Sequence, residues 1–402
     1  MRTKFLSKNI SHILVLDRFQ APIGPLLVWV FIVSVIISSI PMILDGPQRS
    51  ADSNNFLRCV GLMLDQSSLG SAVTGNLSEP WCRAYTGFLL IFAPVVHYFG
   101  HNWPWIIAGL NVIFHALAIT SATALTHIIL RQSWLTMLTA TLLIFSVDIL
   151  IRVNWPIADS FFFLMGTAAF VGTSLAIFFP NSRPIIFGAL ASVGLAGVTK
   201  PHGLIIFVIG ISAILFRHKL AKITPGAGAL LLGSVISAIA ASFFLIAFII
   251  DPSYAPMTTE DAILKEFLIN GQVIEGVYST YNQGTHAYSI RLKTMFERFF
   301  TFFSFFPPHW SIRHIGLSAI FFIPVYVGLF LCWTKFHVKN LDTRVRSLII
   351  LSTVWVLGFA TFAGWFDVSY EFRYRLPIMG VLAFQSVLGI SLFLFHTIES
   401  KN

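Results

Sequence analysis

The residues best suited to chemistry stand at the edges of long apolar runs. Asp52 follows the first such run and begins a segment in which Phe56, Val60, Met63 and Leu64 recur at helical spacing. An amphipathic helix of this kind can lie on a bilayer surface, which would hold the Asp52 carboxylate at the boundary between water and lipid. The structural alternative is a helix cap, because a short polar residue at a helix start accepts first-turn N–H groups.

Further ionisable residues stand at the ends of later apolar runs: Arg152, Asp159, Lys200, His202, Asp367, Glu371, Arg373 and Arg375. Charges at such places are functional candidates, because the hydrocarbon interior tolerates them poorly. Each also has a structural interpretation. Arg152 can anchor the chain at the interface, Asp159 can cap the following helix, and Lys200 can extend its ammonium group to the membrane surface.

Two arginines flank a tyrosine in the last of these places. Arg373 and Arg375 stand on either side of Tyr374, directly before Leu376, Pro377 and a new apolar run. In an extended segment, residues two apart point to the same side, so both guanidinium groups could hold one anion. A phosphate at the membrane surface suits such a pair.

The elements that must position these residues are predicted to be membrane helices. The chain has 402 residues, of which 56% are hydrophobic and 11% charged. A soluble domain carries about 25% charged residues, so the composition indicates a polytopic membrane protein. The net charge of +9 does not indicate nucleic acid, because Lys and Arg fall mostly between the apolar runs. Membrane orientation and anionic lipids account for them.

We predict one all-α transmembrane domain over residues 1–402, with about ten spans: 24–43, 104–130, 134–151, 160–179, 184–199, 203–216, 225–250, 315–334, 347–365 and 377–396. The first run is too long for a cleaved signal peptide and is expected to be a signal anchor. Residues 86–99 are apolar but short, and are predicted to form a re-entrant or surface helix. The Phe-rich stretch 296–308 is expected to lie in the outer leaflet.

The distribution of positive charge predicts the orientation. Lys and Arg concentrate in the short loops on the N-terminal side, which places both termini in the cytoplasm and the segments 44–103 and 251–314 outside. The location predicted is the inner or plasma membrane of the cell, with the site facing outward. Cys59 and Cys82 share the first outward segment and could form a disulfide in an oxidising compartment, whereas Cys332 lies in an apolar run.

Four short segments together carry a resemblance to a known family. They are Asp52-Ser53-Asn54-Asn55-Phe56, Trp155-Pro156-Ile157-Ala158-Asp159-Ser160, Gly197-Val198-Thr199-Lys200-Pro201-His202-Gly203-Leu204 and Glu371-Phe372-Arg373-Tyr374-Arg375-Leu376-Pro377. They resemble the two acidic signatures, the Lys/Arg-Pro-x-Gly turn and the Arg-Tyr-x-x-Pro segment of the GT-C superfamily. These are integral-membrane glycosyltransferases, and the likeness is nearest to the dolichyl-phosphate-mannose-type and lipid A aminoarabinose transferase branch.

The resemblance implies transfer of a sugar from a polyprenyl-phosphate carrier to a glycan, lipid or protein acceptor outside the cytoplasm, with inversion. Asp52 maps to the general base. Asp159 maps to a second catalytic acidic position, which in some relatives sits near a metal or organises the site. The resemblance implies that the carrier phosphate is held by the basic residues Lys200, His202, Arg373 and Arg375. It implies a supporting role for Glu371, Tyr374 and Arg152.

The partners implied are the lipid-linked sugar, the acceptor and membrane lipids, with no nucleic acid. No cofactor is required by the sequence. A divalent cation would have to bind without a second acid, because residues 53–55 lack the one that several branches carry. That departure argues against a metal-dependent mechanism and leaves the metal unknown.

Two other functions fit parts of the sequence. A transporter or flippase of lipid-linked glycans would place ionisable groups inside spans, where His115 and Asp148 stand. No internal repeat accompanies them in the sequence. A glycan polymerase would fit the two large outward segments but not the turn at Lys200.

The orientation predicts which positions an impermeant thiol reagent reaches from outside sealed cells. A single cysteine placed at position 76 or 283 should be labelled, whereas one at 219 or 340 should react only after permeabilisation. The mass shift of each single-cysteine variant provides the measurement. Labelling of position 219 in sealed cells would contradict the predicted orientation.

Overall fold

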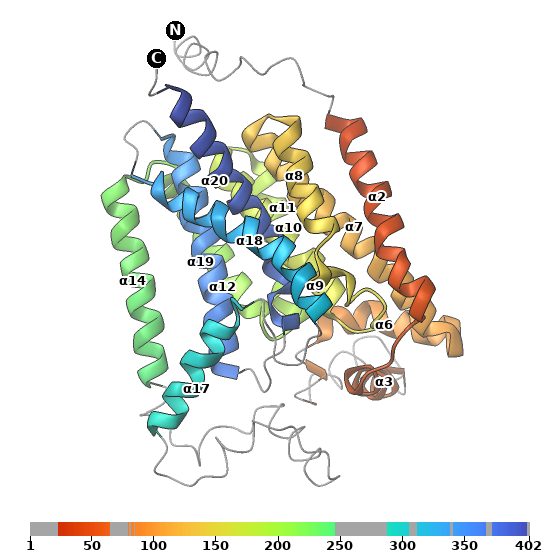
Figure 1. Cartoon of the computed structure of the whole chain (residues 1–402). Helices are drawn as coiled ribbons and strands as arrows, with labels where there is room; N and C mark the ends of the chain where they lie inside the picture. Colours follow the sequence, from red (N-terminus) through yellow and green to blue (C-terminus); the bar gives the residue numbers. More distant parts are fainter. Residues whose placement is uncertain are drawn as a thin grey trace.

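The computed structural model describes residues 23–64, 79, 82–83, 85–245, 288–304, 312–337, 341–366 and 372–399. Every regular element in this part of the chain is a helix (Figure 1). Seven helical stretches of the described residues are long and apolar enough to cross a membrane. They contain α2 (Ile23–Asp45), α7 (Trp103–Leu130), α10 (Asp159–Phe178), α14 (Pro225–Phe244), α18 (Ile312–Thr334), α19 (Thr343–Phe366) and α20 (Met379–Glu399). The chain is therefore an all-α, multi-pass membrane protein, as predicted.

Shorter elements complete the bundle. Three are apolar helices: α8 (Ser133–Ile144), α11 (Arg183–Thr199) and α12 (Gly203–Leu215). The others are α3 (Ala51–Leu64), α6 (Thr86–Phe99), η2 (Gly100–Asn102), α9 (Val147–Leu150), α13 (Arg217–Leu220), α17 (Tyr288–Thr301) and η4 (Phe372–Ile378). In Figure 1, α2 begins and α20 ends at the upper end of the bundle, whereas α3 and α17 lie at the lower end.

The count of ten spans stays a prediction, because three of them are short helices here. The 12 residues of α8 rise only about 18 Å, less than the roughly 30 Å of hydrocarbon. The single helix expected over 134–151 is wrong. The α-helix ends at Ile144, and the separate short helix α9 follows after Phe145 and Ser146. This break places Asp148 outside a regular spanning helix.

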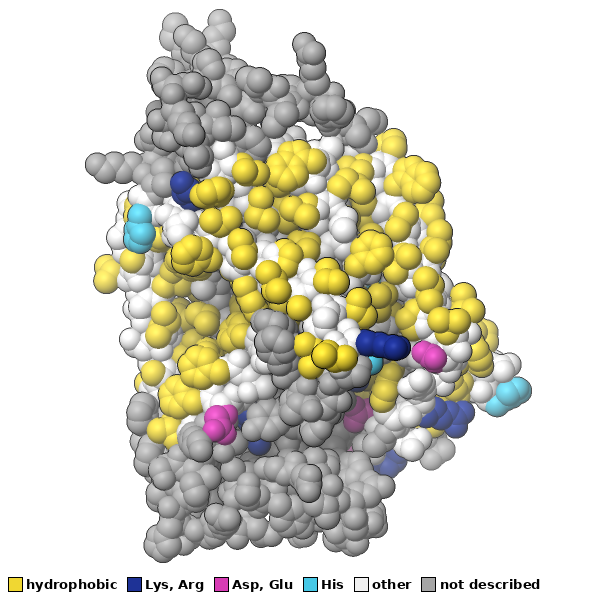
Figure 2. All heavy atoms as spheres, viewed as in Figure 1, with side chains coloured by type: hydrophobic (Ala, Val, Ile, Leu, Met, Phe, Trp, Pro, Cys, Tyr) yellow, Lys and Arg dark blue, Asp and Glu magenta, His cyan; other side chains and the backbone are white. Residues whose placement is uncertain are grey.

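The helices pack closely where glycines face one another. A side chain on Gly389 of α20 would come within 1.9 Å of the Gly328 carbonyl of α18, so these helices touch through their backbones. Small residues at helix crossings are typical of membrane bundles, because association there depends on van der Waals contact. Outside this core, hydrophobic side chains cover much of the face seen in Figure 2, and many of the charges visible there lie toward its lower end.

Besides the main hydrophobic core between the long helices, a second hydrophobic cluster forms at the lower end of the bundle. The apolar face of α3 is buried there: Phe56, Val60 and Met63 pack in one cluster with Phe88 and Phe92 of α6. The face expected to lie on lipid therefore lies largely on protein, and of the predicted apolar positions only Leu64 is exposed.

The first turn of α3 is capped by serines. The Ser53 backbone N–H donates to Ser50 Oγ at 3.3 Å, and the Ser50 N–H donates to Ser53 Oγ at 3.2 Å. This reciprocal pair resembles a capping box. The structural alternative for Asp52, that of the cap, is therefore wrong, because Ser50 occupies the capping position.

Residues 86–99 form the separate helix α6, as predicted. The chain leaves α6 through Gly100, whose φ of +49° favours glycine, and then begins α7. In Figure 1, α6 lies near α3 at the lower end of the bundle, and the two helices share the second cluster. This arrangement supports a helix at the surface of the bundle.

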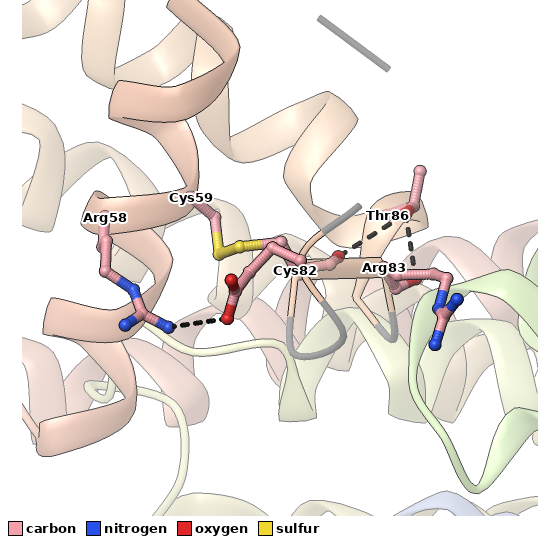
Figure 3. The surroundings of a disulfide bond; sticks show 6 residues. Arg58, Cys59, Cys82, Arg83 and Thr86 are labelled. Atoms are coloured by element: carbon pink, nitrogen blue, oxygen red, sulfur yellow. Dashed lines mark hydrogen bonds and ion pairs between the residues drawn. A yellow bond between two sulfur atoms is a disulfide. The ribbon is translucent and has the colours of Figure 1, made fainter. Parts of the chain in front are cut away.

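A disulfide joins Cys59 of α3 to Cys82, with Cα atoms 5.6 Å apart (Figure 3). The predicted pairing is thus confirmed. Both cysteines are fully buried in the second cluster, and the Arg58–Glu79 ion pair lies beside them at 3.2 Å.

Thiol counting tests the bridge. Alkylation of denatured, unreduced protein should modify one cysteine, Cys332, and prior reduction should raise the number to three. Removing the bridge with Cys59→Ser and Cys82→Ser should lower the stability of this region by about 3 kcal/mol, since the bridge closes a loop of 23 residues. Cys332→Ser is the matched control. Three modified thiols without reduction would contradict the bridge.

Candidate active site

An ion pair joins the start of α10 to the end of α11. Lys200 Nζ donates to Asp159 Oδ1, and both side chains are about 95% buried. Asp159 is the first residue of α10, and Lys200 follows the last residue of α11 in an extended conformation. The structure thus brings together two site residues that stand 41 positions apart in the sequence. It does so directly, carboxylate to ammonium.

The turn after Lys200 requires its glycine. A side chain on Gly203 would lie 1.9 Å from the Ala196 carbonyl oxygen, so no other residue fits without moving the backbone. The turn directs His202 into the bundle, where its ring packs 4.2 Å from the Phe362 ring and 6.5 Å from Phe162. His202 and Lys200 therefore lie buried at the same junction of helices.

His115 of α7 extends this cluster. It is fully buried, and its ring stands edge-on to Phe163 of α10 at 5.5 Å. Neither ring nitrogen has a hydrogen-bond partner among the described residues. The sequence indicated His115 only as a possible transport residue, because Phe163, the residue it contacts on α10, is 48 positions away. The packing of α7 on α10 brings His115 against the Phe163 ring, in the part of α10 that begins with Asp159.

A second buried ion pair lies nearby. Arg375 Nε donates to Asp148 Oδ2 at 2.7 Å, with the two side chains 1% and 4% exposed. The guanidinium also donates through Nη1 to the carbonyls of Ser304 and Phe302, and lies 4.2 Å from the Phe322 ring. Arg375 therefore connects η4, α9, the end of α17 and α18.

The expected extended geometry around Arg375 is wrong. Residues Phe372–Ile378 form the 3-10 helix η4, which has about three residues per turn. Residues two apart then point in different directions, so Arg373 and Arg375 do not line one side of a strand. The Arg373 and Tyr374 side chains, together with Asp367 and Glu371, lie outside the described residues.

One short segment links the two ion pairs. Residues 148–159 run from Asp148 to Asp159, and Asn111 of α7 donates to their Val153 and Trp155 carbonyls at 3.1 and 2.8 Å. Arg152, half-buried in this segment, stacks on the Trp155 ring at 5.4 Å. Its interfacial interpretation and its supporting role are both compatible with that contact.

Asp52 reaches the same region through α3. The next residue, Ser53, donates to the Pro156 carbonyl at 3.4 Å, and the Gln48 N–H donates to the Asn154 carbonyl at 2.9 Å. Asp52 is half-buried in the first turn of α3. Its helix is therefore attached to the segment that begins α10, three residues before Asp159.

The two pairs share one end of the bundle. Pro377 of η4 packs against Gly166 in the second turn of α10, where an added side chain would meet it at 3.1 Å. The site therefore comprises Asp52 at its edge, the pair Asp159–Lys200 with His115 and His202, and the pair Asp148–Arg375. Sequence reasoning did not assign Asp148 and His115 to this site. The missing signals were the burial of Asp148 against Arg375 and the burial of His115 at the contact of α7 with α10.

The described residues hold no group of three or more His, Cys, Asp and Glu side chains arranged to bind a metal ion. Comparison of the chain with protein-family models, with curated proteins and with solved structures finds no match. The functional argument therefore rests on the chemistry of the site itself.

That chemistry is unusual for a membrane bundle. Burying an ion pair rarely stabilises a protein, because desolvation offsets most of the attraction. Two such pairs at one end of an apolar bundle therefore indicate a site rather than a source of stability. In each pair one carboxylate compensates the charge of the cation and holds it in position.

The Asp159–Lys200 pair predicts strong energetic coupling. Lys200→Met alone leaves a buried carboxylate uncompensated and should destabilise by about 3–5 kcal/mol, whereas Lys200→Met combined with Asp159→Asn should cost less. Denaturant titration of the purified protein and its variants measures both. The matched control is the exposed pair Arg58–Glu79, for which we expect a coupling of about 1 kcal/mol or less. Equal coupling energies in the two pairs would contradict the assignment of Asp159 and Lys200 as a buried ion pair.

Proposed function

We propose that this protein is a glycosyltransferase that moves a sugar from a polyprenyl-phosphate carrier to a glycan, lipid or protein acceptor on the outer face of the membrane, with inversion. The observation that carries the proposal is the meeting of Asp159, Lys200 and His202 beside the segment to which α3 attaches Asp52. A transfer at the membrane surface needs a cationic site for a phosphate and a carboxylate for the acceptor. Both stand at this end of the bundle.

In the proposed reaction, an acceptor hydroxyl attacks the anomeric carbon while the bond from that carbon to the phosphate oxygen breaks. The hydroxyl proton goes to the Asp52 carboxylate, and the electron pair of the broken bond stays on the carrier phosphate. Ser50 caps α3, so the Asp52 carboxylate is not the helix cap. Its half-buried place at the edge of the site suits a base that meets an acceptor from water.

Lys200 and His202 are proposed to hold the carrier phosphate, together with Arg373. The positive charge of Lys200 and Arg373 and a hydrogen bond from His202 would stabilise the charge that develops on the leaving phosphate. Asp159 orients Lys200 through their ion pair. Arg375 acts as a positioning residue in this scheme, because its Nε and Nη1 groups already donate to Asp148 and to the Phe302 and Ser304 carbonyls. These contacts hold η4, and with it Arg373, in place.

The disulfide supports the outward orientation of the site. Cys59 and Cys82 lie at the same end as α3, where an oxidising compartment would preserve their bond. A polyprenyl-phosphate donor on that face matches a chain whose positive loops lie at the opposite end. We propose that both termini are cytoplasmic and that the site faces outward.

A transporter or flippase of lipid-linked glycans remains the second candidate, and His115 favours it. A fully buried histidine inside α7 with no hydrogen-bond partner among the described residues is a feature of proton-coupled pathways. Asp148 no longer supports transport, because its carboxylate holds Arg375 at the end of the bundle.

Substrate consumption distinguishes the two functions. Purified protein is incubated with a panel of polyprenyl-phosphate sugars and a mixture of envelope glycans and lipids, and mass spectrometry follows the donors. A transferase should convert at least one donor to free polyprenyl phosphate with gain of one sugar on an acceptor. Movement of intact donor across proteoliposomes without conversion would instead favour transport.

Asp52→Asn tests the general base. The substitution keeps the size of the side chain and leaves the Ser50 cap intact, so folding and donor binding should persist while turnover falls by about 10²–10⁴-fold. Turnover is measured at saturating donor. Asp45→Asn, at the end of α2, and Asp65→Asn, just after α3, are the matched controls and should turn over normally. Normal turnover of Asp52→Asn would remove the assignment.

A further inference from the structure

A cavity of about 610 Å³ lies away from the candidate active site, between α12, α14 and α19. Its walls are almost entirely apolar, and they include Val208, Ala213, Leu231 and Ile350. The volume is within the roughly 300–1,000 Å³ of typical ligand sites. Val208 on its rim is 56% exposed, so the cavity opens toward the surface that faces lipid.

The cavity lies at the opposite end of α12 from Lys200. The 13 residues of α12 rise about 20 Å from the turn at His202 to Phe216, which lines the cavity. The cavity and the Asp159–Lys200 pair therefore share no residue and lie toward opposite faces of the membrane.

Its shape is built into the packing of the helices. On one side, Thr343 Oγ1 donates to the Ala221 carbonyl at 2.7 Å, which fixes the turn after α13 to α19. On the other side, α14 approaches α19 through Gly228, where a side chain would come within 2.8 Å of Ile350. Figure 1 shows α14 at the outer edge of the bundle. The space between α14 and α12 is left open.

Two lysines stand at the mouth of the cavity. Lys219 and Lys222 line it and are exposed, and neither forms an ion pair with a described residue. The Lys219 ammonium group lies 5.7 Å from the centre of the Phe216 ring. Among the described residues that line the cavity there is no Asp or Glu. An apolar slot with only positive charge at its mouth complements an acyl chain joined to an anionic head group.

The neighbouring arginines have different roles. Arg217 donates to the Pro180 and Ile214 carbonyls, each at 2.9 Å, and Arg346 is buried and donates to Ile223 and Phe336 carbonyls at 3.4 Å. The nearby carboxylate of Asp342 accepts from the Arg344 backbone N–H at 2.8 Å. The two lysines are thus the cations placed to receive a head group.

We propose that this cavity binds one anionic phospholipid of the bilayer, with an acyl chain between α12 and α14 and its phosphate at Lys219 and Lys222. The site is independent of the proposed transferase activity. Bound lipid would fill the gap between α14 and the rest of the bundle and so hold α14 in position.

Native mass spectrometry of the delipidated protein tests the proposal with phosphatidylglycerol and phosphatidylcholine as probes. The native protein should bind phosphatidylglycerol more tightly. Each basic residue near a head group changes affinity about fivefold, so Lys219→Ala with Lys222→Ala should weaken phosphatidylglycerol binding about 30-fold and leave phosphatidylcholine unchanged. Lys335→Ala is the charge control, since Lys335 stacks on Phe393 and does not line the cavity.

A second variant tests the acyl slot. Ala227→Trp fills the cavity and should abolish binding, whereas Leu230→Trp on the same helix does not line the cavity and should bind normally. Equal binding of the two lipids by the native protein, or binding that survives Ala227→Trp, would overturn the proposal. Displacement of phosphatidylglycerol by equimolar polyprenyl phosphate would overturn the choice of ligand and assign the site to the carrier.

Discussion

The constraint on which the lower end of the bundle depends is that a buried charge must be compensated. The Arg375 guanidinium meets the Asp148 carboxylate, two backbone carbonyls and the face of an aromatic ring within one buried space. These contacts come from α9, the end of α17, α18 and η4. In a medium of low dielectric, removing any one of them leaves a charge that the apolar surroundings cannot stabilise. One side chain thus fixes four segments that the sequence separates widely.

The Asp159–Lys200 pair follows the same physics and adds a requirement on the backbone. Lys200 reaches Asp159 from the end of α11, and the chain must then turn within three residues to begin α12. Only glycine fits at position 203, beside the Ala196 carbonyl. The same turn therefore directs Lys200 toward Asp159 and brings His202 among the aromatic rings of α10 and α19. The tight turn at Gly203 thus both packs α11 against α12 and brings the site residues together.

Two regions of opposite character result from this arrangement. At one end, carboxylates and cations are buried against each other, and α3, which a disulfide joins to Cys82, is attached to the segment that begins α10. At the other end, Lys219 and Lys222 stay exposed at the mouth of an apolar cavity. At the first end every described cation of the two ion pairs is matched by a carboxylate. At the second end the two lysines have no acidic residue beside them in the lining of the cavity, so their charge attracts an anionic head group.

The amino-acid sequence by itself determined the membrane class, the positions of most helices and the separate helix over 86–99. It placed Cys59 and Cys82 in one segment where they could pair, and the structure decided that they do. The length of a hydrophobic run, the placement of charges and the spacing of cysteines are read directly from the sequence, and they do not depend on how the helices pack. The ends of helices were harder to predict. The break after Ile144, the Ser50 cap and the helical form of residues 372–378 depend on hydrogen bonds and packing that single-sequence patterns do not encode.

Only the tertiary structure decided which charges meet. Asp148, Asp159, Lys200 and Arg375 were all visible in the sequence, but nothing local pairs residues that lie 41 or 227 positions apart. The partners are selected by the crossing of helices, because each buried charge stabilises the arrangement that brings an opposite charge to it. The burial of His115 and the cavity beside α14 likewise became visible only in the structure. Burial and empty space are properties of packed helices, and the order of residues along the chain does not contain them.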